Sequence, residues 1–94
     1  MTLDQFRRTL DDGAPPETIA APLAALWWAG KGDWDKAHTI VMDDGSREAA
    51  WVHAYLHRDE GDLPNARYWY RHAARAPATA PLEREWEEIA TALL

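Results

Sequence analysis

Two histidines four positions apart, His53 and His57, are the side chains of this sequence best suited to do chemistry. Residues at this spacing leave the same side of a helix, which lets two imidazoles bind one metal ion. His38 lies on the segment expected to form the preceding helix and would supply a third nitrogen. Asp59 and Glu60 are the nearest carboxylates in the sequence. Together these residues define a candidate metal site.

A structural role competes with this hypothesis. His53 and His57 would also suit the less buried edge of a central helix, where each hydrogen-bonds to backbone or to a carboxylate. The His-Glu-x-x-His motif of zinc proteases is absent, because position 54 is alanine. We therefore favour the structural role and expect no metal and no cofactor. The alternative is a protein, possibly an enzyme, that binds a small ligand or a metal ion through His38, His53 and His57.

Aromatic side chains are the second notable feature. The sequence has six tryptophans and three tyrosines, more than a core of this size hides completely. Thin, alanine-rich helices need a few large rings to fill the space between them, so most of the rings should be core. Trp27 and Trp28 are neighbours and point about 100° apart, so one should lie near the surface. The candidate binding surface comprises Trp28, Trp51, His53, Tyr55, His57 and Tyr68.

Composition argues against several other functions. Without cysteine there is no disulfide, no thiolate ligand and no cysteine nucleophile. The only serine, Ser46, is explained as a helix cap, so no nucleophile–base pair can be identified. The net charge of −6 disfavours nucleic acid and anionic membranes as partners. Residues 1–10 lack the features of a signal peptide, which favours a cytoplasmic protein.

Capping residues and apolar periodicity predict an all-α protein. Asp33, Ser46 and Asp62 are each suited to cap the helix that follows, and Gly30 and Gly61 to end the helix that precedes. The helix that begins after Ser46 is apolar nearly all round, which is typical of a central, buried helix. We expect helices over residues 3–11, 22–29, 34–42, 47–60, 63–75 and 82–93.

The chain contains an internal repeat. Residues 32–37, Gly-Asp-Trp-Asp-Lys-Ala, return as residues 61–66, Gly-Asp-Leu-Pro-Asn-Ala, displaced by 29 positions (61 minus 32). Each copy joins two apolar helices through a Gly-Asp turn, which is how a helical-hairpin repeat is written in sequence. We expect one domain over residues 1–94, with an N-terminal helix in 1–13, hairpins in 22–44 and 46–75, and a capping helix in 81–94.

The second hairpin resembles a tetratricopeptide-type repeat. The order of Ala54, Gly61-Asp62, Ala66, Trp69-Tyr70 and Ala73 matches the family pattern, and residues 66–74 resemble its Sel-like branch. The resemblance implies two stacked helical hairpins that bind a protein segment. His53 and His57 stand where the pattern has large apolar residues. The stretch from 51 to 57, Trp-Val-His-Ala-Tyr-Leu-His, also resembles a group of short bacterial proteins of uncharacterised function.

These features lead to specific expectations. Ala37 and Ala66 should be buried at close helix crossings, and Trp69 should be a central core residue. The C-terminal helix should cover the open end of the second hairpin. We expect a non-catalytic module that presents an aromatic surface to a protein or peptide. Repeat arrays usually need about three units for a sufficient core, so two hairpins require either end caps, anchored by Phe6 and Trp86, or self-association as a homodimer.

Overall fold

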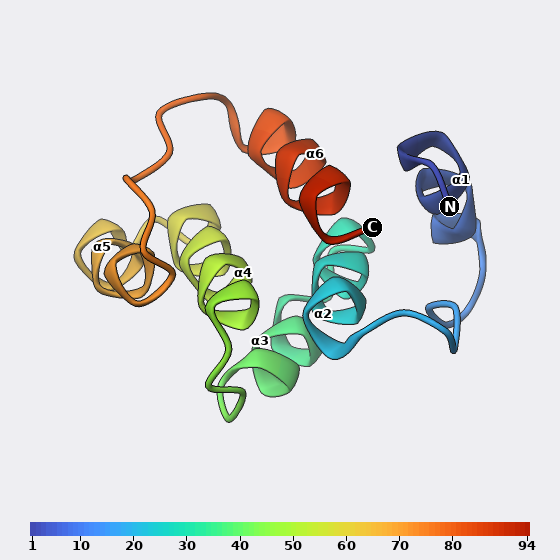
Figure 1. Ribbon diagram of the computed structural model, residues 1–94, viewed down its shortest axis with the longest axis horizontal. Helices are drawn as coiled ribbons and strands as arrows, with labels where there is room; N and C mark the ends of the chain where they lie inside the picture. Colours follow the sequence, from blue (N-terminus) through green and yellow to red (C-terminus); the bar gives the residue numbers. More distant parts are fainter.

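The computed structural model describes residues 1–94 and contains helices but no strands (Figure 1). The all-α fold expected from the sequence is confirmed. Most observed helices agree with the expected ones to within two residues, but α5 ends three residues early. The elements are α1 (Leu3–Arg8), the 3-10 helix η1 (Thr9–Asp11), α2 (Ala21–Gly30), α3 (Trp34–Val41), α4 (Arg47–Asp59), α5 (Leu63–His72) and α6 (Leu82–Leu93).

Side-chain caps fix where the helices begin. The side chains of Asp33, Ser46 and Asp62 each accept a hydrogen bond from the backbone amide three residues later. Each cap satisfies one of the amides that a helix leaves unpaired in its first turn. Thr2 and Gln5 form a reciprocal capping box at the start of α1. These starts are therefore encoded locally, and the sequence predicts them correctly.

The two Gly-Asp turns have the same geometry. Gly32 and Gly61 both adopt left-handed backbone angles, with φ of 82° and 88°. The next amide, of Asp33 or Asp62, donates to a carbonyl five residues back at 2.9 Å in both turns. The two copies of the sequence motif thus form matching turns. The expectation that Gly30 ends α2 is wrong, because Gly30 is helical and the left-handed turn belongs to Gly32.

Helix α4 is the centre of the fold. Helices α2 and α3 pack together, α4 packs against α5, and α3 packs against α4. Every residue from 51 to 57 is buried, as the all-round apolar pattern predicts. Ala37 and Ala66 are 0% and 2% exposed, so both repeat alanines are buried as expected.

The C-terminal helix lies elsewhere than expected. Helix α6 packs against α4, α2 and α1, across the first helix of each pair, whereas α5 lies on the other side of α4 (Figure 1). Trp86 anchors it, since its indole N–H donates to the Leu26 carbonyl at 2.9 Å and its ring stacks on Phe6. The sequence shows that α6 is amphipathic, but its apolar stripe does not reveal which helices it covers.

A buried carboxylate ties α6 to the rest of the protein. Glu85 is 1% exposed and accepts hydrogen bonds from Arg58 at 3.0 Å, from the Trp51 indole at 3.3 Å and from the Tyr70 hydroxyl at 2.5 Å. Arg58 also donates to the Ala80 carbonyl. Burial, followed by the hydrogen bond to Glu85, raises the pKa of Tyr70 well above its usual value, so its hydroxyl stays a donor. One side chain of α6 thereby joins α4 and α5.

Trp69 corrects another expectation. Helix α5 buries Ala66 and Tyr70, which lie four positions apart, so Tyr70 and not Trp69 is the core aromatic residue. Trp69 is only partly buried, and its ring stacks on His53 with 3.9 Å between ring centres. The aromatic pair in the sequence pattern does not by itself reveal the rotation of the helix.

None of the helices has the length and apolar character needed to cross a lipid bilayer.

Replacing Glu85 tests the buried carboxylate. Glu85→Gln removes a charge that Arg58 needs inside the protein, so we expect a loss of about 2–4 kcal/mol in the free energy of unfolding, measured with urea. Glu88→Gln, on the exposed side of the same helix, should change it by less than about 0.5 kcal/mol. Equal effects of the two substitutions would contradict the central role of Glu85.

Replacing Ala66 tests the close crossing of α4 and α5. Ala66→Leu adds three carbons where the side chain is 2% exposed, and overpacking should cost about 1–3 kcal/mol in the same measurement. Ala92→Leu, at an exposed position of α6, is the matched control and should be close to neutral. A neutral result for Ala66→Leu would mean that the two helices do not meet closely at this residue.

Candidate metal centre

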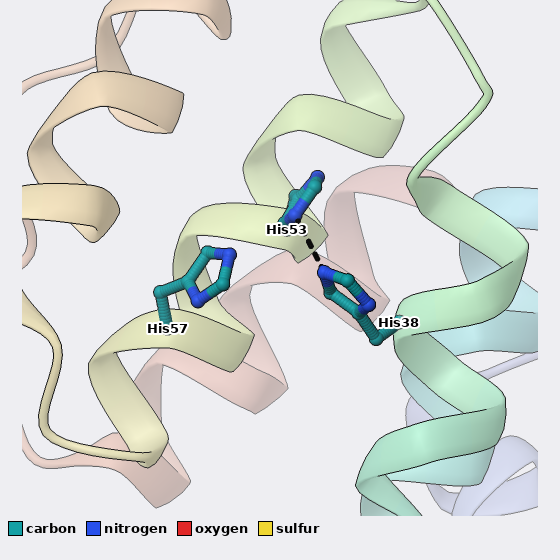
Figure 2. Close-up of side chains that lie close together, drawn as sticks. All are labelled: His38, His53 and His57. Carbon is teal, nitrogen blue, oxygen red and sulfur yellow. Dashed lines mark hydrogen bonds between the residues drawn. The ribbon is translucent and has the colours of Figure 1, made fainter.

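Helices α3 and α4 bring three histidines together. His53 and His57 leave the same side of α4, and His38 faces them from α3 (Figure 2). Each residue offers a ring nitrogen that lies within 4.8 Å of the other two. The Nε2 atoms of His38 and His53 are 3.1 Å apart. The structure therefore assembles the three residues that the sequence nominates as an alternative metal site.

The cluster is buried on one side and accessible on the other. His53 and His57 are 3% and 6% exposed, whereas His38 is only partly buried. Of the three rings, His38 is therefore the one that is nearest to solvent.

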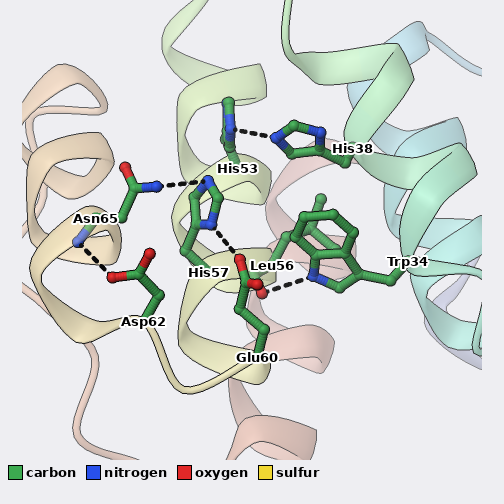
Figure 3. Close-up of polar contacts among 8 residues, drawn as sticks. All are labelled: Trp34, His38, His53, Leu56, His57, Glu60, Asp62 and Asn65. Carbon is green, nitrogen blue, oxygen red and sulfur yellow. Dashed lines mark hydrogen bonds and ion pairs between the residues drawn. The ribbon is translucent and has the colours of Figure 1, made fainter.

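Two polar residues contact His57 from outside the triad. The Glu60 Oε2 atom lies 2.5 Å from Nδ1 of His57, and the Asn65 amide nitrogen lies 3.3 Å from its Nε2 (Figure 3). A carboxylate can only accept, so Nδ1 carries the proton and donates it to Glu60. In a neutral imidazole the other nitrogen then keeps a lone pair, and at Nε2 that lone pair accepts from Asn65.

Two tryptophans hold the other rings. Trp34 stacks on His38 with 4.7 Å between ring centres and 12° between ring planes. Its indole N–H donates to the Leu56 carbonyl at 2.8 Å, which fixes the indole against α4. Trp69 stacks on His53 with 14° between ring planes. Locked rings lose little further conformational freedom when a ligand binds, so the site is preorganised.

The environment keeps two of the histidines, His38 and His53, neutral. Burial, with smaller contributions from His57 and His38, lowers the pKa of His53 to about 4. Burial and then His57 lower the pKa of His38. Both rings are therefore uncharged at neutral pH, which is the form that ligates metal.

One ring nitrogen of the buried His53 side chain makes no hydrogen bond. Its Nε2 faces His38, but its Nδ1 is buried and has no hydrogen-bond partner. Leaving a buried polar atom unpaired costs about 1–3 kcal/mol, so a purely stabilising role would be poorly served by this ring.

The nitrogen spacing suits a transition metal. Zinc binds imidazole nitrogen at about 2.0–2.1 Å, so two nitrogens on one tetrahedral ion lie about 3.3–3.4 Å apart. The 3.1 Å between His38 and His53 is close to this value. The widest spacing allowed within the triad, 4.8 Å, needs a closure of about 1.5 Å to reach the same geometry.

The other residues of the expected binding surface do not join this site. Trp51 and Tyr55 are 6% and 8% exposed, and Trp51 points to Glu85 of α6. With His53 and His57, four of the six expected surface residues are thus buried. Burial, followed by the charge of Asp59, raises the pKa of Tyr55 to about 12. Trp28, which lies under the Lys36 ammonium at 4.2 Å, is partly buried, and only Tyr68 is fully exposed, at 46%.

Sequence reasoning missed three residues that flank the histidines. Trp34 precedes His38 by four positions, so helical spacing alone could have paired the two rings. Trp69 was assigned to the core instead. Asn65 has no signal in the sequence, because its contact with His57 depends on the packing of α5 against α4.

Comparison of the chain with protein-family models, with curated proteins and with solved structures finds no match. The geometry and chemistry of the site are therefore the basis for inferring what it does.

The stability of the metal-free protein should depend on pH through His53. Its folded-state pKa of about 4 lies below the model value of 6.5, so between these values the unfolded chain binds more protons. Stability should therefore be greatest above pH 6.5 and fall as the pH is lowered towards 4. Urea unfolding in the presence of a chelator at pH 7.5, 6.5 and 5.5 measures this dependence.

Two variants test whether His53 causes this pH dependence of stability. His53→Gln cannot titrate and should reduce the loss of stability between pH 7.5 and 5.5 to the part that His38 contributes, whereas His72→Gln, on the exposed side of α5, should keep the wild-type dependence. If His53→Gln lost as much stability over this range as the wild type, His53 would not be held neutral by the fold.

Proposed function

We propose that the protein binds one divalent transition-metal ion, with zinc as the best fit, through His38, His53 and His57. The observation that carries this proposal is the convergence of three ring nitrogens within 4.8 Å from two different helices. The preference for a structural role, favoured from the sequence, gives way to the alternative for this reason.

Burial and charge support binding over simple packing. Three imidazoles in mutual contact would repel one another if protonated, and the low pKa values of His38 and His53 reflect this together with burial. The Nε2 atoms of His38 and His53 face each other at 3.1 Å, so at least one of the two directs a lone pair towards the other ring. A cation is the ligand that converging imidazole lone pairs attract best.

The donor set limits the choice of ion. Imidazole suits Zn²⁺, Cu²⁺ and Ni²⁺, whereas Mg²⁺ and Ca²⁺ prefer oxygen ligands. Three protein ligands leave further coordination positions for water or a bound molecule, as in zinc sites that exchange their fourth ligand. A metal ion would supply Lewis acidity there; the chain itself supplies the neutral nitrogens and excludes water on the α4 side.

The ion would also join the two helix pairs. His38 belongs to α3, in the first pair, and His53 and His57 belong to α4, in the second. A bond from each side to one ion ties the pairs together, so binding should stabilise the folded protein.

We also propose that the two pairs are divergent tetratricopeptide-type repeats. The support is the shared geometry of the turns at Gly32 and Gly61 and the burial of Ala37 and Ala66 at equivalent positions. In this interpretation α6 covers the first helix of each repeat. A protein partner would then have to approach elsewhere, and Tyr68 on the outer face of α5 is the exposed aromatic residue suited to meet it.

Zinc titration tests the proposed function. Tag-free protein, stripped with chelator, should bind one zinc ion per chain by isothermal titration calorimetry at pH 7.5. Zinc at 100 times its dissociation constant should stabilise the fold by about 2.7 kcal/mol, seen as a higher melting temperature that chelator reverses.

Substitutions locate the ion. The double variant His53→Gln/His57→Gln should lose both the binding and the thermal shift, and His38→Gln should weaken both. His72→Gln, outside the triad, should behave like the wild type. Wild-type protein that binds no zinc, copper or nickel, or a double variant that still binds one ion, would refute the proposal.

A further inference from the structure

We propose that Glu60 and Asn65 tune the metal affinity of His57 in opposite directions: Glu60 raises it by positioning the ring, and Asn65 lowers it by competing for the same lone pair. This inference rests on the proposed function. Both residues touch His57 and neither belongs to the triad (Figure 3).

Glu60 determines which nitrogen of His57 is free. Its Oε2 lies 2.5 Å from Nδ1, and the carboxylate has no proton to give, so it holds the ring in the form protonated at Nδ1. The lone pair is then at Nε2. Metal-binding histidines commonly donate their other N–H to a carboxylate, which orients the ring and makes it a better donor to the metal.

The neighbouring carboxylate provides a matched control. Asp59 is also exposed and also lies at the C-terminal end of α4, but it makes no hydrogen bond or ion pair with a histidine. Asp59→Asn removes the same formal charge from the same end of α4, where the charge of Asp59 acts on Tyr55. A difference between the two acids therefore separates the local interactions of Glu60 from a general loss of negative charge.

Asn65 uses the lone pair that a metal needs. Its amide nitrogen lies 3.3 Å from Nε2 of His57 and donates to it. One lone pair cannot serve an amide N–H and a metal ion at once, so binding at Nε2 must displace Asn65. The backbone amide of Asn65 donates to the cap Asp62 at 3.3 Å, so the first turn of α5 stays in place when the side chain moves away.

The repeat architecture explains why positions 57 and 65 meet. Subtracting the 29-residue period gives positions 28 and 36, and there the Lys36 ammonium lies 4.2 Å from the centre of the Trp28 ring. The same pair of repeat positions is thus in contact in both copies. Backbone geometry sets the proximity of these side chains, and only their chemistry differs. Replacing Asn65 should therefore change the competition without moving His57.

Zinc affinities of four proteins test the inference: the wild type, Glu60→Gln, Asp59→Asn and Asn65→Ala, each tag-free, at pH 7.5, in competition with a chelating dye. Glu60→Gln should raise the dissociation constant about 10–100-fold, and Asp59→Asn should leave it nearly unchanged. Asn65→Ala should lower it about fivefold, the factor that corresponds to one net hydrogen bond.

The tautomer of His57 in metal-free protein gives an independent readout. Nitrogen NMR of the side chain should find the proton at Nδ1 in the wild type, in Asp59→Asn and in Asn65→Ala, and a mixture of tautomers in Glu60→Gln. A merely structural role of Glu60 would not move this signal. Urea unfolding without metal checks that each variant is folded.

Each result decides a different point. Weaker binding by Glu60→Gln with an unchanged tautomer would make Glu60 a direct ligand and overturn its positioning role. Equal affinity of Glu60→Gln and the wild type, or weaker binding by Asn65→Ala, would overturn the inference while the metal site stands. A wild type that binds no ion would refute the metal site itself, and the tuning with it.

Discussion

The enclosure of α4 is the constraint on which the rest of the structure depends. Every side chain from Trp51 to His57 is buried, so each polar group on this stretch has to find its partner inside the protein. An unpaired polar group in such a place costs as much as a stabilising contact gains. The polar side chains of α4 find partners in two groups. One group gathers around Glu85 of α6, and the other is the histidine cluster beside α3.

On the side facing α6 the demand is fully met. The Glu85 carboxylate accepts from Trp51, Arg58 and Tyr70, so three donors share one buried acceptor group. Such a closed network specifies one position for α6, and it leaves no donor to recruit a ligand. Among the histidines of α4 the demand is met only in part, because the buried Nδ1 of His53 has no hydrogen-bond partner. An apolar residue would avoid this cost, so the polar groups of α4 differ in how completely they are paired.

Local signals explain what the sequence predicts well. Caps at Asp33, Ser46 and Asp62 and the left-handed Gly61 depend on residues within one turn, so the helix starts follow from short-range rules. The spacing of His53 and His57 likewise fixes their common face. The predictions that were wrong concern how the helices pack against one another. The docking of α6 and the rotation that buries Tyr70 instead of Trp69 are set by contacts between segments distant in sequence. The contact of Asn65 with His57 belongs to the same class.

The internal repeat of the sequence places one side-chain contact at equivalent positions in its two copies. Both copies form the same turn and the same contact between helix faces, and in the first copy Trp28 and Lys36 occupy that contact as a cation over an aromatic ring. In the second copy the contact is made by an imidazole and an amide, and His53 adds a further nitrogen one turn earlier on α4. The two contacts therefore differ in their side chains and share the same turn geometry. His53 and His57 are polar residues on a stretch of α4 that is otherwise apolar and buried, so their imidazoles meet in an enclosed place. His38 completes the triad because α3 packs directly against α4, so the same stacking that builds the core also brings the third nitrogen within reach.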